Sequence, residues 1–211
     1  AGLSRDAIPA DIEEMIRNSP EAVDLLRAIQ DYKLTETDLR EIREVFVAEK
    51  TSALIIAAGM GSRLRPYTDD KPKCMLEFGG MTLLERQINT YRACGISDIS
   101  VIRGYHKEKI NYKGIRFFEN NDFKHNNILH SLFYGREEIK GHVICAYSDI
   151  LFEPLVVKRA LASNHDISIV VDIDWRDYYI DRKDHPMEEA ESVVFDINNK
   201  ASRSLGKQEP P

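Results

Sequence analysis

The chain has 211 residues and carries 35 acidic against 29 basic side chains, a formal net charge of −6. This acidic balance excludes a general nucleic-acid binder, because affinity for a polyanion depends on Lys and Arg side chains that neutralise phosphates. Hydrophobic residues make up 43% and charged residues 30% of the sequence, which is typical of a globular domain rather than a disordered or fibrous chain.

Residues 1–50 are predicted to be helical. Ile8, Ile12 and Met15 follow helical spacing, and a later apolar stripe runs from Leu39 to Phe46. Three short helices bury little apolar surface by themselves, so we expect them to pack on something else. We predict a helical extension or the tail of a preceding domain, suited to pairing with a second copy of the chain.

Strands and helices are predicted to alternate over residues 51–211. The run Ala53–Ala58 is continuously apolar, as expected of a strand buried on both faces. Further strands are predicted at 99–102, 115–118, 143–147 and 167–172, helices at 83–94, 127–139 and 154–162, and a hairpin at 192–205. This order predicts an α/β fold, a doubly wound and mainly parallel sheet.

The sequence shows no pattern of a membrane protein or of a disulfide-rich protein. Its longest apolar runs, Ala53–Ala58 and Val143–Tyr147, fall far short of the roughly 20 residues that cross a bilayer. Cys74, Cys94 and Cys145 are odd in number and lack the CxxC spacing of a zinc site. The N-terminal residues have no secretory signal pattern. We predict a cytoplasmic protein with neither membrane nor nucleic-acid partner.

A glycine-containing loop follows the first predicted strand, where an open α/β sheet binds its ligand. Gly59 and Gly61 have no Cβ, so their amides can approach phosphate oxygens closely. Arg63 offers a planar fork and Lys73 a point charge for a polyphosphate. A simple turn with solvated basic residues is an equally weighted alternative at this point. The loop fits neither a Walker A motif nor a dinucleotide fingerprint, which needs a small residue where Leu64 stands.

The segment from Leu54 to Thr68, followed by Lys71-Pro-Lys73, resembles the signature loop of the nucleotidyltransferases that make activated sugars and cholines. The order Gly-x-Gly-x-Arg-x-x-Pro-x-Thr…Pro-Lys is far more specific than a lone Gly-x-Gly. Further matches are Leu84–Ile88, Cys94–Ile96, Gly104-Tyr105, Asn126-Asn127 with Ser131, Ser148–Phe152 and Asp172–Arg176. The resemblance covers about residues 53–206, implies a Rossmann-like fold, and is strongest to the cytidylyltransferases for phosphocholine and 2-aminoethylphosphonate.

The resemblance implies a reaction. An oxygen of a small phosphorylated or phosphonate acceptor attacks the α-phosphorus of a nucleoside triphosphate, with CTP favoured, and pyrophosphate leaves. Such chemistry needs positioning, a Mg²⁺ cofactor and fixed cations against the developing charge. A sugar-1-phosphate nucleotidyltransferase and a truncated, non-catalytic nucleotide-binding or assembly module stay open as alternatives.

The resemblance also implies roles for individual residues. Lys73 lies between the α-phosphate and the acceptor anion in the family, so Lys73 and Arg63 are the predicted catalytic residues. Asp149 follows a predicted strand and is the predicted Mg²⁺ ligand, with capping of the next helix as its alternative. Capping is likewise an equally weighted alternative for Asn127. The predicted nucleotide-binding residues are Ala58, Gly59, Gly61, Ser62, Arg63, Gly104, Asn127 and Ser131.

Acidic and aromatic side chains follow the last predicted strand. Asp174, Trp175 and Tyr178 are predicted to bind the acceptor's ammonium group by Coulomb and cation–π attraction, while Lys73 binds its anion. A tryptophan that anchors a loop is the alternative of about equal weight. The family binds its metal with two Asp residues, and no match to the second follows the late hairpin. We therefore expect the nucleotidyltransferase domain over 51–211 to lack its C-terminal part.

Overall fold

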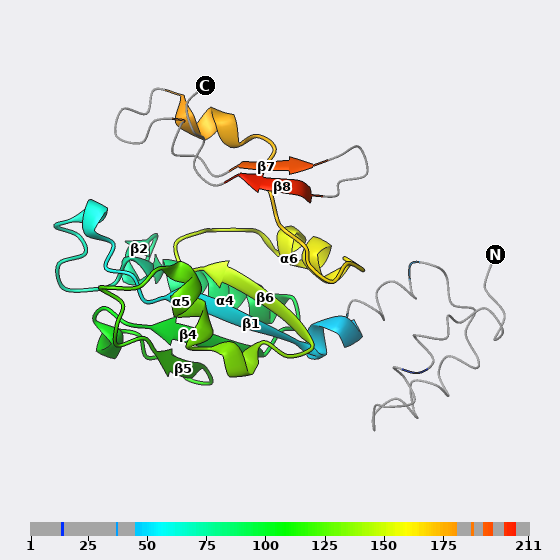
Figure 1. Ribbon diagram of the computed structural model, residues 1–211. Helices are drawn as coiled ribbons and strands as arrows, with labels where there is room; N and C mark the ends of the chain where they lie inside the picture. Colours follow the sequence, from blue (N-terminus) through cyan, green and yellow to red (C-terminus); the bar gives the residue numbers. More distant parts are fainter. Residues whose placement is uncertain are drawn as a thin grey trace. The chain divides into compact units, whose positions relative to one another are not determined.

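The computed structural model describes residues 45–180, together with Glu14, Thr37, Met187, Ser192–Phe195 and 201–205. The chain divides into two compact units, Ala1–Asn164 and His165–Pro211 (Figure 1). The predicted helical extension over 1–50 lies mostly outside the described residues. Its last part, residues 45–49, is helical, and it buries Phe46 and Ala48. A role of the extension in dimerisation or in linkage to another domain stays a prediction.

Four parallel strands form the central sheet of the first unit. They are β1 (Thr51–Ala57), β4 (Asp98–Arg103), β5 (Arg116–Glu119) and β6 (His142–Tyr147), in the order β5-β4-β1-β6. Every residue of β1 is buried, as its apolar run predicts. The chain winds outward from β1 through β4 and β5, then returns to place β6 on the other side of β1. The predicted doubly wound α/β sheet is therefore confirmed, and its switch point lies at β1.

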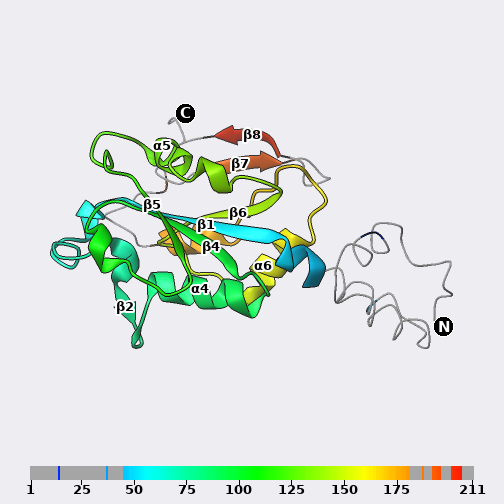
Figure 2. The same cartoon turned by 90° about the horizontal axis from the view of Figure 1, so that it is seen from below.

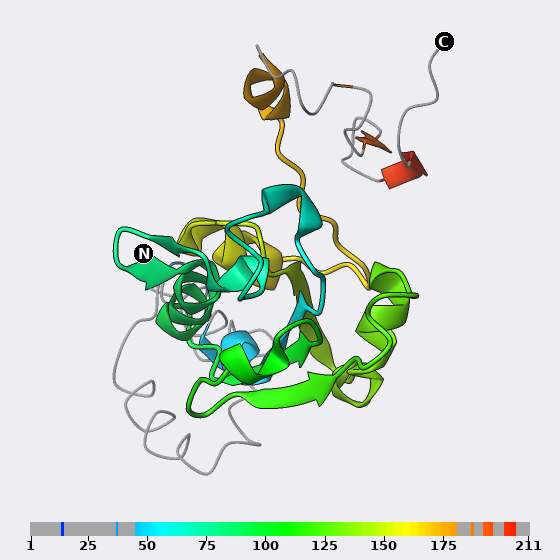
Figure 3. The same ribbon diagram turned by 90° about the vertical axis from the view of Figure 1, so that its left-hand side faces the viewer.

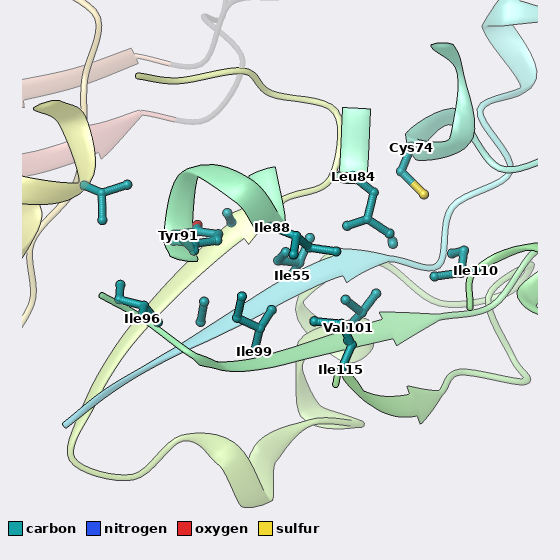
Figure 4. Close-up of a cluster of buried hydrophobic side chains, with 14 of the residues drawn as sticks. Ile55, Cys74, Leu84, Ile88, Tyr91, Ile96, Ile99, Val101, Ile110 and Ile115 are labelled. Carbon is teal, nitrogen blue, oxygen red and sulfur yellow. The ribbon is translucent and has the colours of Figure 1, made fainter. Parts of the chain in front are cut away.

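Helices cover both faces of this sheet. Helices α4 (Leu83–Ala93) and α6 (Pro154–Leu161) lie on one face, and α5 (Ile128–Phe133) lies on the other (Figure 2). Successive residues of a strand point to opposite faces. Accordingly Ile55 joins the core beneath α4 (Figure 4), whereas Leu54 joins the smaller core beneath α5.

Helix α4 begins where the sequence predicts it. The Thr82 hydroxyl accepts a hydrogen bond from the Glu85 amide at 3.0 Å, which is the expected capping contact. A short antiparallel pair, β2 (Glu77–Phe78) and β3 (Met81–Thr82), leads into this helix. This pair of short strands is not among the elements predicted from the sequence. No helix within the described residues has the length and apolar character needed to span a membrane.

Two predicted elements differ from the structure. The helix predicted over 127–139 ends at Phe133, and a separate 3₁₀ turn, Arg136–Glu138, follows. Gly135 separates the two, since its backbone leaves helical geometry with φ −101° and ψ 17°, and it packs closely on the sheet, where a Cβ would lie 3.0 Å from Leu54 Cδ1. The strand predicted over 167–172 does not form among the described residues. The backbone N–H and C=O groups of a strand need hydrogen-bond partners on a neighbouring strand, and an apolar run alone does not supply them.

The second unit contains the 3₁₀ helix η6 (Trp175–Tyr179) and an antiparallel hairpin of β7 (Ser192–Phe195) and β8 (Ala201–Leu205). The late hairpin predicted from the sequence is thus confirmed.

Candidate active site

Most of the predicted site residues of the first unit lie on loops that leave the carboxyl ends of three adjacent strands, whereas Asn127 and Ser131 lie at the start of α5 and within it. Strand β1 leads into the loop 58–73, β4 leads to Gly104, and β6 leads to Asp149. Figure 3 shows the molecule from the side where the loop after β1 lies. The carboxyl ends of parallel strands meet at one edge, so the fold gathers these residues where an α/β sheet binds its ligand.

The loop after β1 folds back on itself. Gly61 has φ 61° and precedes the 3₁₀ turn η2 (Ser62–Leu64), and a Cβ built on it would lie 3.1 Å from Lys73 Cβ. Thr68 is fully buried, and its hydroxyl donates to the Gly61 carbonyl at 2.9 Å. These contacts bring the two ends of the loop together, and they require glycine at position 61. Ser62 and Arg63 lie on the turn, and Arg63 is exposed.

Lys73 and Asp149 meet although 76 residues separate them. Lys73 Nζ donates to Asp149 Oδ2 at 2.8 Å, and each side chain keeps 37% of its surface exposed. An ion pair this accessible contributes only about 0–1 kcal/mol to stability, so ligands can replace either partner at low cost. Asp149 does not cap the following helix, because Glu153 is the N-cap of α6. The structure therefore brings together the predicted phosphate-binding cation and the predicted metal ligand.

Asp149 is suited to a metal that shares its ligands with a substrate. Among the described residues no group of three His, Cys, Asp or Glu side chains could hold a metal ion. Mg²⁺ is commonly bound by one or two carboxylates, with waters and substrate phosphates completing its octahedron. One carboxylate beside the predicted phosphate-binding loop fits this arrangement.

Cys74 follows Lys73 and is buried, so its thiol is poorly suited to act as a nucleophile. Burial raises the pKa of the Cys74 thiol to about 12, an effect that hydrogen bonds, one of them with Ser148, only partly offset. The thiolate is the nucleophilic form, and it is scarcely populated near neutral pH. The charged group available at this end of the loop is therefore the Lys73 ammonium.

Two residues that hold the site in place have no role assigned in the sequence analysis. The side-chain amide of Gln87 donates to the carbonyls of Tyr147 and Ile150 at 2.8 and 2.6 Å. The Tyr105 hydroxyl contacts the carbonyls of Thr68 and Asp69, each at 3.0 Å. Both residues lie in motif segments quoted above, so the motif was the signal, but their partners are visible only in three dimensions.

Gly104 is placed by close backbone contact. A Cβ there would lie 2.8 Å from the Ala58 carbonyl oxygen and 3.0 Å from the Asn120 carbonyl oxygen. The neighbouring Tyr105 amide donates to the same Ala58 oxygen at 3.1 Å. The loop after β4 thus rests on the first residue of the loop after β1. A direct contact of Ala58 or Gly104 with a nucleotide stays a prediction.

Asn127 and Ser131 are both used within the fold. Asn127 caps α5, since its side-chain oxygen accepts from the His130 amide at 3.0 Å, which confirms the capping assignment. Ser131 is buried, and its hydroxyl accepts from the side chain of the fully buried Asn120 at 2.8 Å. Asn120 also exchanges two hydrogen bonds with Asn126. This network fixes the turn between β5 and α5, while contact with a nucleotide stays a prediction.

The predicted acceptor residues Asp174, Trp175 and Tyr178 belong to the second unit. The rings of Trp175 and Tyr179 meet edge to face, with centroids 5.6 Å apart. The Arg176 guanidinium lies 5.5 Å from the centre of the Trp175 ring, which is a cation–π contact within the chain. Tyr178 is exposed. That these side chains share a ligand with Lys73 stays a prediction.

Gly104→Ala is expected to destabilise the protein by about 1–3 kcal/mol, because the new methyl group would overlap two backbone oxygens that cannot rotate away. Gly59→Ala is the matched control. A Cβ at Gly59 meets no atom within 4 Å, so its effect should stay within about 0.5 kcal/mol. Denaturant unfolding of both variants measures the difference, and equal losses would contradict the close approach at Gly104.

Residues 53–187 match the family described as the MobA-like NTP transferase domain. The chain is also similar to the CTP:phosphoglutamine cytidylyltransferase of Campylobacter jejuni, with 31% identity over 74% of this chain and 66% of that protein. Similarity to the choline-phosphate cytidylyltransferase of Streptococcus pneumoniae is 35% identity over 48% of this chain and 46% of that protein. The UTP–glucose-1-phosphate uridylyltransferase of Haloferax volcanii is 30% identical over 58% of this chain and 55% of its own length. The matched segments span about half to two thirds of these relatives.

Proposed function

We propose a specific reaction for this chain, which belongs to the MobA-like NTP transferase domain family: transfer of a cytidylyl group from CTP to a small phosphate or phosphonate that carries an ammonium group. An acceptor oxygen attacks the α-phosphorus of CTP, the bond from that phosphorus to the bridging oxygen breaks, and pyrophosphate leaves. Membership of the family confirms the resemblance found in the sequence. The nucleotide and the acceptor are the proposed part.

The 2.8 Å contact between Lys73 Nζ and Asp149 Oδ2 is the observation that carries the proposal. In the proposal, the Lys73 ammonium at the end of the glycine-containing loop binds an α-phosphate oxygen, and the neighbouring Asp149 carboxylate after β6 binds Mg²⁺. With Mg²⁺ and a triphosphate bound, Lys73 would pair with a phosphate oxygen and Asp149 with the metal ion, so neither charge would be left without a partner. The ammonium would then lie where negative charge develops.

The remaining triphosphate contacts come from the loop after β1. Gly61, Ser62 and the exposed Arg63 lie on one turn, so backbone amides and a guanidinium can meet the β- and γ-phosphates together. Asp149 would hold Mg²⁺, which neutralises charge on the phosphate oxygens during transfer. The protein itself would contribute to catalysis by aligning the triphosphate with the acceptor oxygen.

Support for an ammonium-bearing acceptor comes from Trp175 and from two relatives. The Trp175 ring lies 5.5 Å from a guanidinium, and Asp174 adds a negative charge beside it. Two of the relatives named above are cytidylyltransferases, one of them for choline-phosphate. The relative that uses glucose-1-phosphate supports the alternative, a sugar-1-phosphate acceptor with no ammonium group.

Pyrophosphate release from the purified protein tests the proposal. CTP, UTP, GTP and ATP are each combined with phosphocholine, 2-aminoethylphosphonate and glucose-1-phosphate in the presence of Mg²⁺. The proposal predicts the largest turnover for CTP with one of the two ammonium-bearing acceptors. Preference for UTP with glucose-1-phosphate would establish the sugar alternative. Tight CTP binding without turnover on any acceptor would establish the non-catalytic module.

Trp175→Ala is expected to lower kcat/KM for an ammonium-bearing acceptor roughly 2- to 30-fold, since a cation–π contact contributes about 0.5–2 kcal/mol. CTP affinity should be unchanged. Trp175→Phe keeps an aromatic face and should retain most of the activity, which makes it the matched control. Steady-state kinetics with the acceptor varied measure both variants. If Trp175→Ala handles such acceptors as well as the wild type does, Trp175 is not part of the acceptor site.

A further inference from the structure

We infer that Gln87 is a positioning residue for Asp149, because its buried amide holds the backbone on both sides of that carboxylate. The inference rests on the proposed function, in which Asp149 meets Mg²⁺. Gln87 itself touches neither metal nor substrate.

Gln87 lies on the core face of α4, beside Leu84, Ile88 and Tyr91, and only 1% of its surface is exposed. Its Nε2 donates to the carbonyl of Tyr147, the last residue of β6, at 2.8 Å. The same nitrogen donates to the carbonyl of Ile150 at 2.6 Å. A side-chain amide has two N–H donors, and the two carbonyls that flank residues 148 and 149 take both of them.

The Gln87 amide is not fully hydrogen-bonded within the core. Gln87 Oε1 is buried and has no hydrogen-bond partner within the described part of the chain. A buried acceptor without a partner is unfavourable, and an apolar side chain of the same length would avoid that cost. Such a side chain would also leave the two carbonyls without their donor. The two N–H donors therefore explain why a polar residue occupies this position. The carbonyls that accept from them flank residues 148 and 149.

A third contact completes the support of this loop. The Ser148 amide donates to the Ile56 carbonyl at 3.2 Å, which ties the end of β6 to β1. The loop is thus held from the sheet on one side and from α4 on the other, and Asp149 lies between these contacts. A displacement of about 1 Å in a positioned group can cost 10²-fold in rate. Gln87 supplies the hydrogen bonds from α4 to this loop, while the Tyr91 ring of the same helix packs on Phe152 further along the chain.

Gln87→Met keeps the length of the side chain and removes both donors. We expect the Mg²⁺ concentration that gives half-maximal CTP binding to rise about tenfold, the lower end of the effect seen when a group supporting a metal ligand is removed. Calorimetry at a series of Mg²⁺ concentrations measures this shift. Hydrogen–deuterium exchange of a peptide covering residues 147–151 should become faster. In kinetics at limiting Mg²⁺, kcat should fall while the KM for the acceptor stays near its wild-type value.

Thr90→Val is the matched control, since it removes a hydroxyl from the same helix. That hydroxyl donates to the Arg86 carbonyl at 2.9 Å, within α4. The control should keep the wild-type Mg²⁺ dependence and the wild-type exchange of the peptide covering residues 147–151. Gln87→Asn serves as a second variant if Gln87→Met does not fold, because its amide is one methylene too short to reach both carbonyls.

The outcomes separate the inference from the proposed function. Wild-type protein that binds no CTP with Mg²⁺ would overturn the proposed function, and with it the role of Gln87 toward a metal. Normal wild-type binding, with the same Mg²⁺ dependence and the same peptide exchange in a Gln87 variant, would overturn the inference alone. A shift confined to the Gln87 variants, absent from Thr90→Val, is the result the inference predicts.

Discussion

Lys73→Ala is expected to lower kcat about 100-fold or more, the size of effect that follows loss of one electrostatic donor at a transition state. CTP affinity should change only a few-fold. Negative charge builds on the oxygens of the α-phosphorus during transfer, so an ammonium held there binds the transition state more tightly than the ground state. The 2.8 Å contact shows that the Lys73 side chain is directed toward Asp149, the proposed metal ligand. Steady-state kinetics and calorimetry with CTP measure the two quantities.

Lys109→Ala is the matched control for Lys73→Ala. Lys109 is exposed in the loop after β4, so its loss removes the same charge from the same edge of the sheet. Its activity should stay close to that of the wild type. A Lys73→Ala enzyme with a raised KM and an unchanged kcat would show that Lys73 only binds substrate.

Asp149→Asn is expected to lower kcat/KM about 100-fold or more, because metal polarisation of phosphoryl oxygens is worth several kcal/mol and each 1.4 kcal/mol is a factor of about ten. The amide has nearly the shape of the carboxylate but lacks the charge that Mg²⁺ requires. The ion pair with Lys73 is partly exposed, so thermal stability should change little. Activity measured over a range of Mg²⁺ concentrations should show a much higher metal requirement.

Asp69→Asn gives the matched control for Asp149→Asn. Asp69 also forms an exposed ion pair, with Arg65 at 3.4 Å, in the loop after β1. Its removal takes one carboxylate from the same region, and the metal requirement should not move. A wild-type Mg²⁺ dependence in Asp149→Asn would mean that Asp149 is no metal ligand.

The sheet could be predicted because its strands are short apolar runs between turn residues. The predicted ranges 99–102 and 143–147 each lie within one residue of β4 and β6. Strand β1 is buried at every position and β4 from Ile99 to Ile102, and this burial leaves a largely apolar run in the sequence. The strand predicted over 167–172 has the same pattern, yet no strand forms there. An apolar run in the sequence therefore forms a buried strand only where a neighbouring strand is available to pair with it.

The sequence predicts that most of the proposed site residues gather at one edge of the sheet, but it does not predict the contacts between them. The spacing of Gly59, Gly61, Arg63 and Lys73 identified the loop, and the topology implied that Asp149 lies at the same edge. The ion pair between Lys73 and Asp149 depends on side-chain placement across 76 residues, which spacing does not encode. Gln87 was missed for a related reason. In sequence it is one polar residue among helix formers, and its two carbonyl partners lie 60 and 63 residues away.

We propose that the chain catalyses attack on the α-phosphorus of a nucleoside triphosphate, and the fate of labelled phosphorus tests this proposal most directly. CTP labelled with ³²P at the α-position is incubated with Mg²⁺ and either phosphocholine or 2-aminoethylphosphonate, and a parallel reaction uses label at the γ-position. We predict that the α-label moves to a product containing the acceptor, while the γ-label appears only in pyrophosphate. A γ-label recovered on the acceptor, or as free orthophosphate with no α-labelled conjugate, would contradict nucleotidyl transfer.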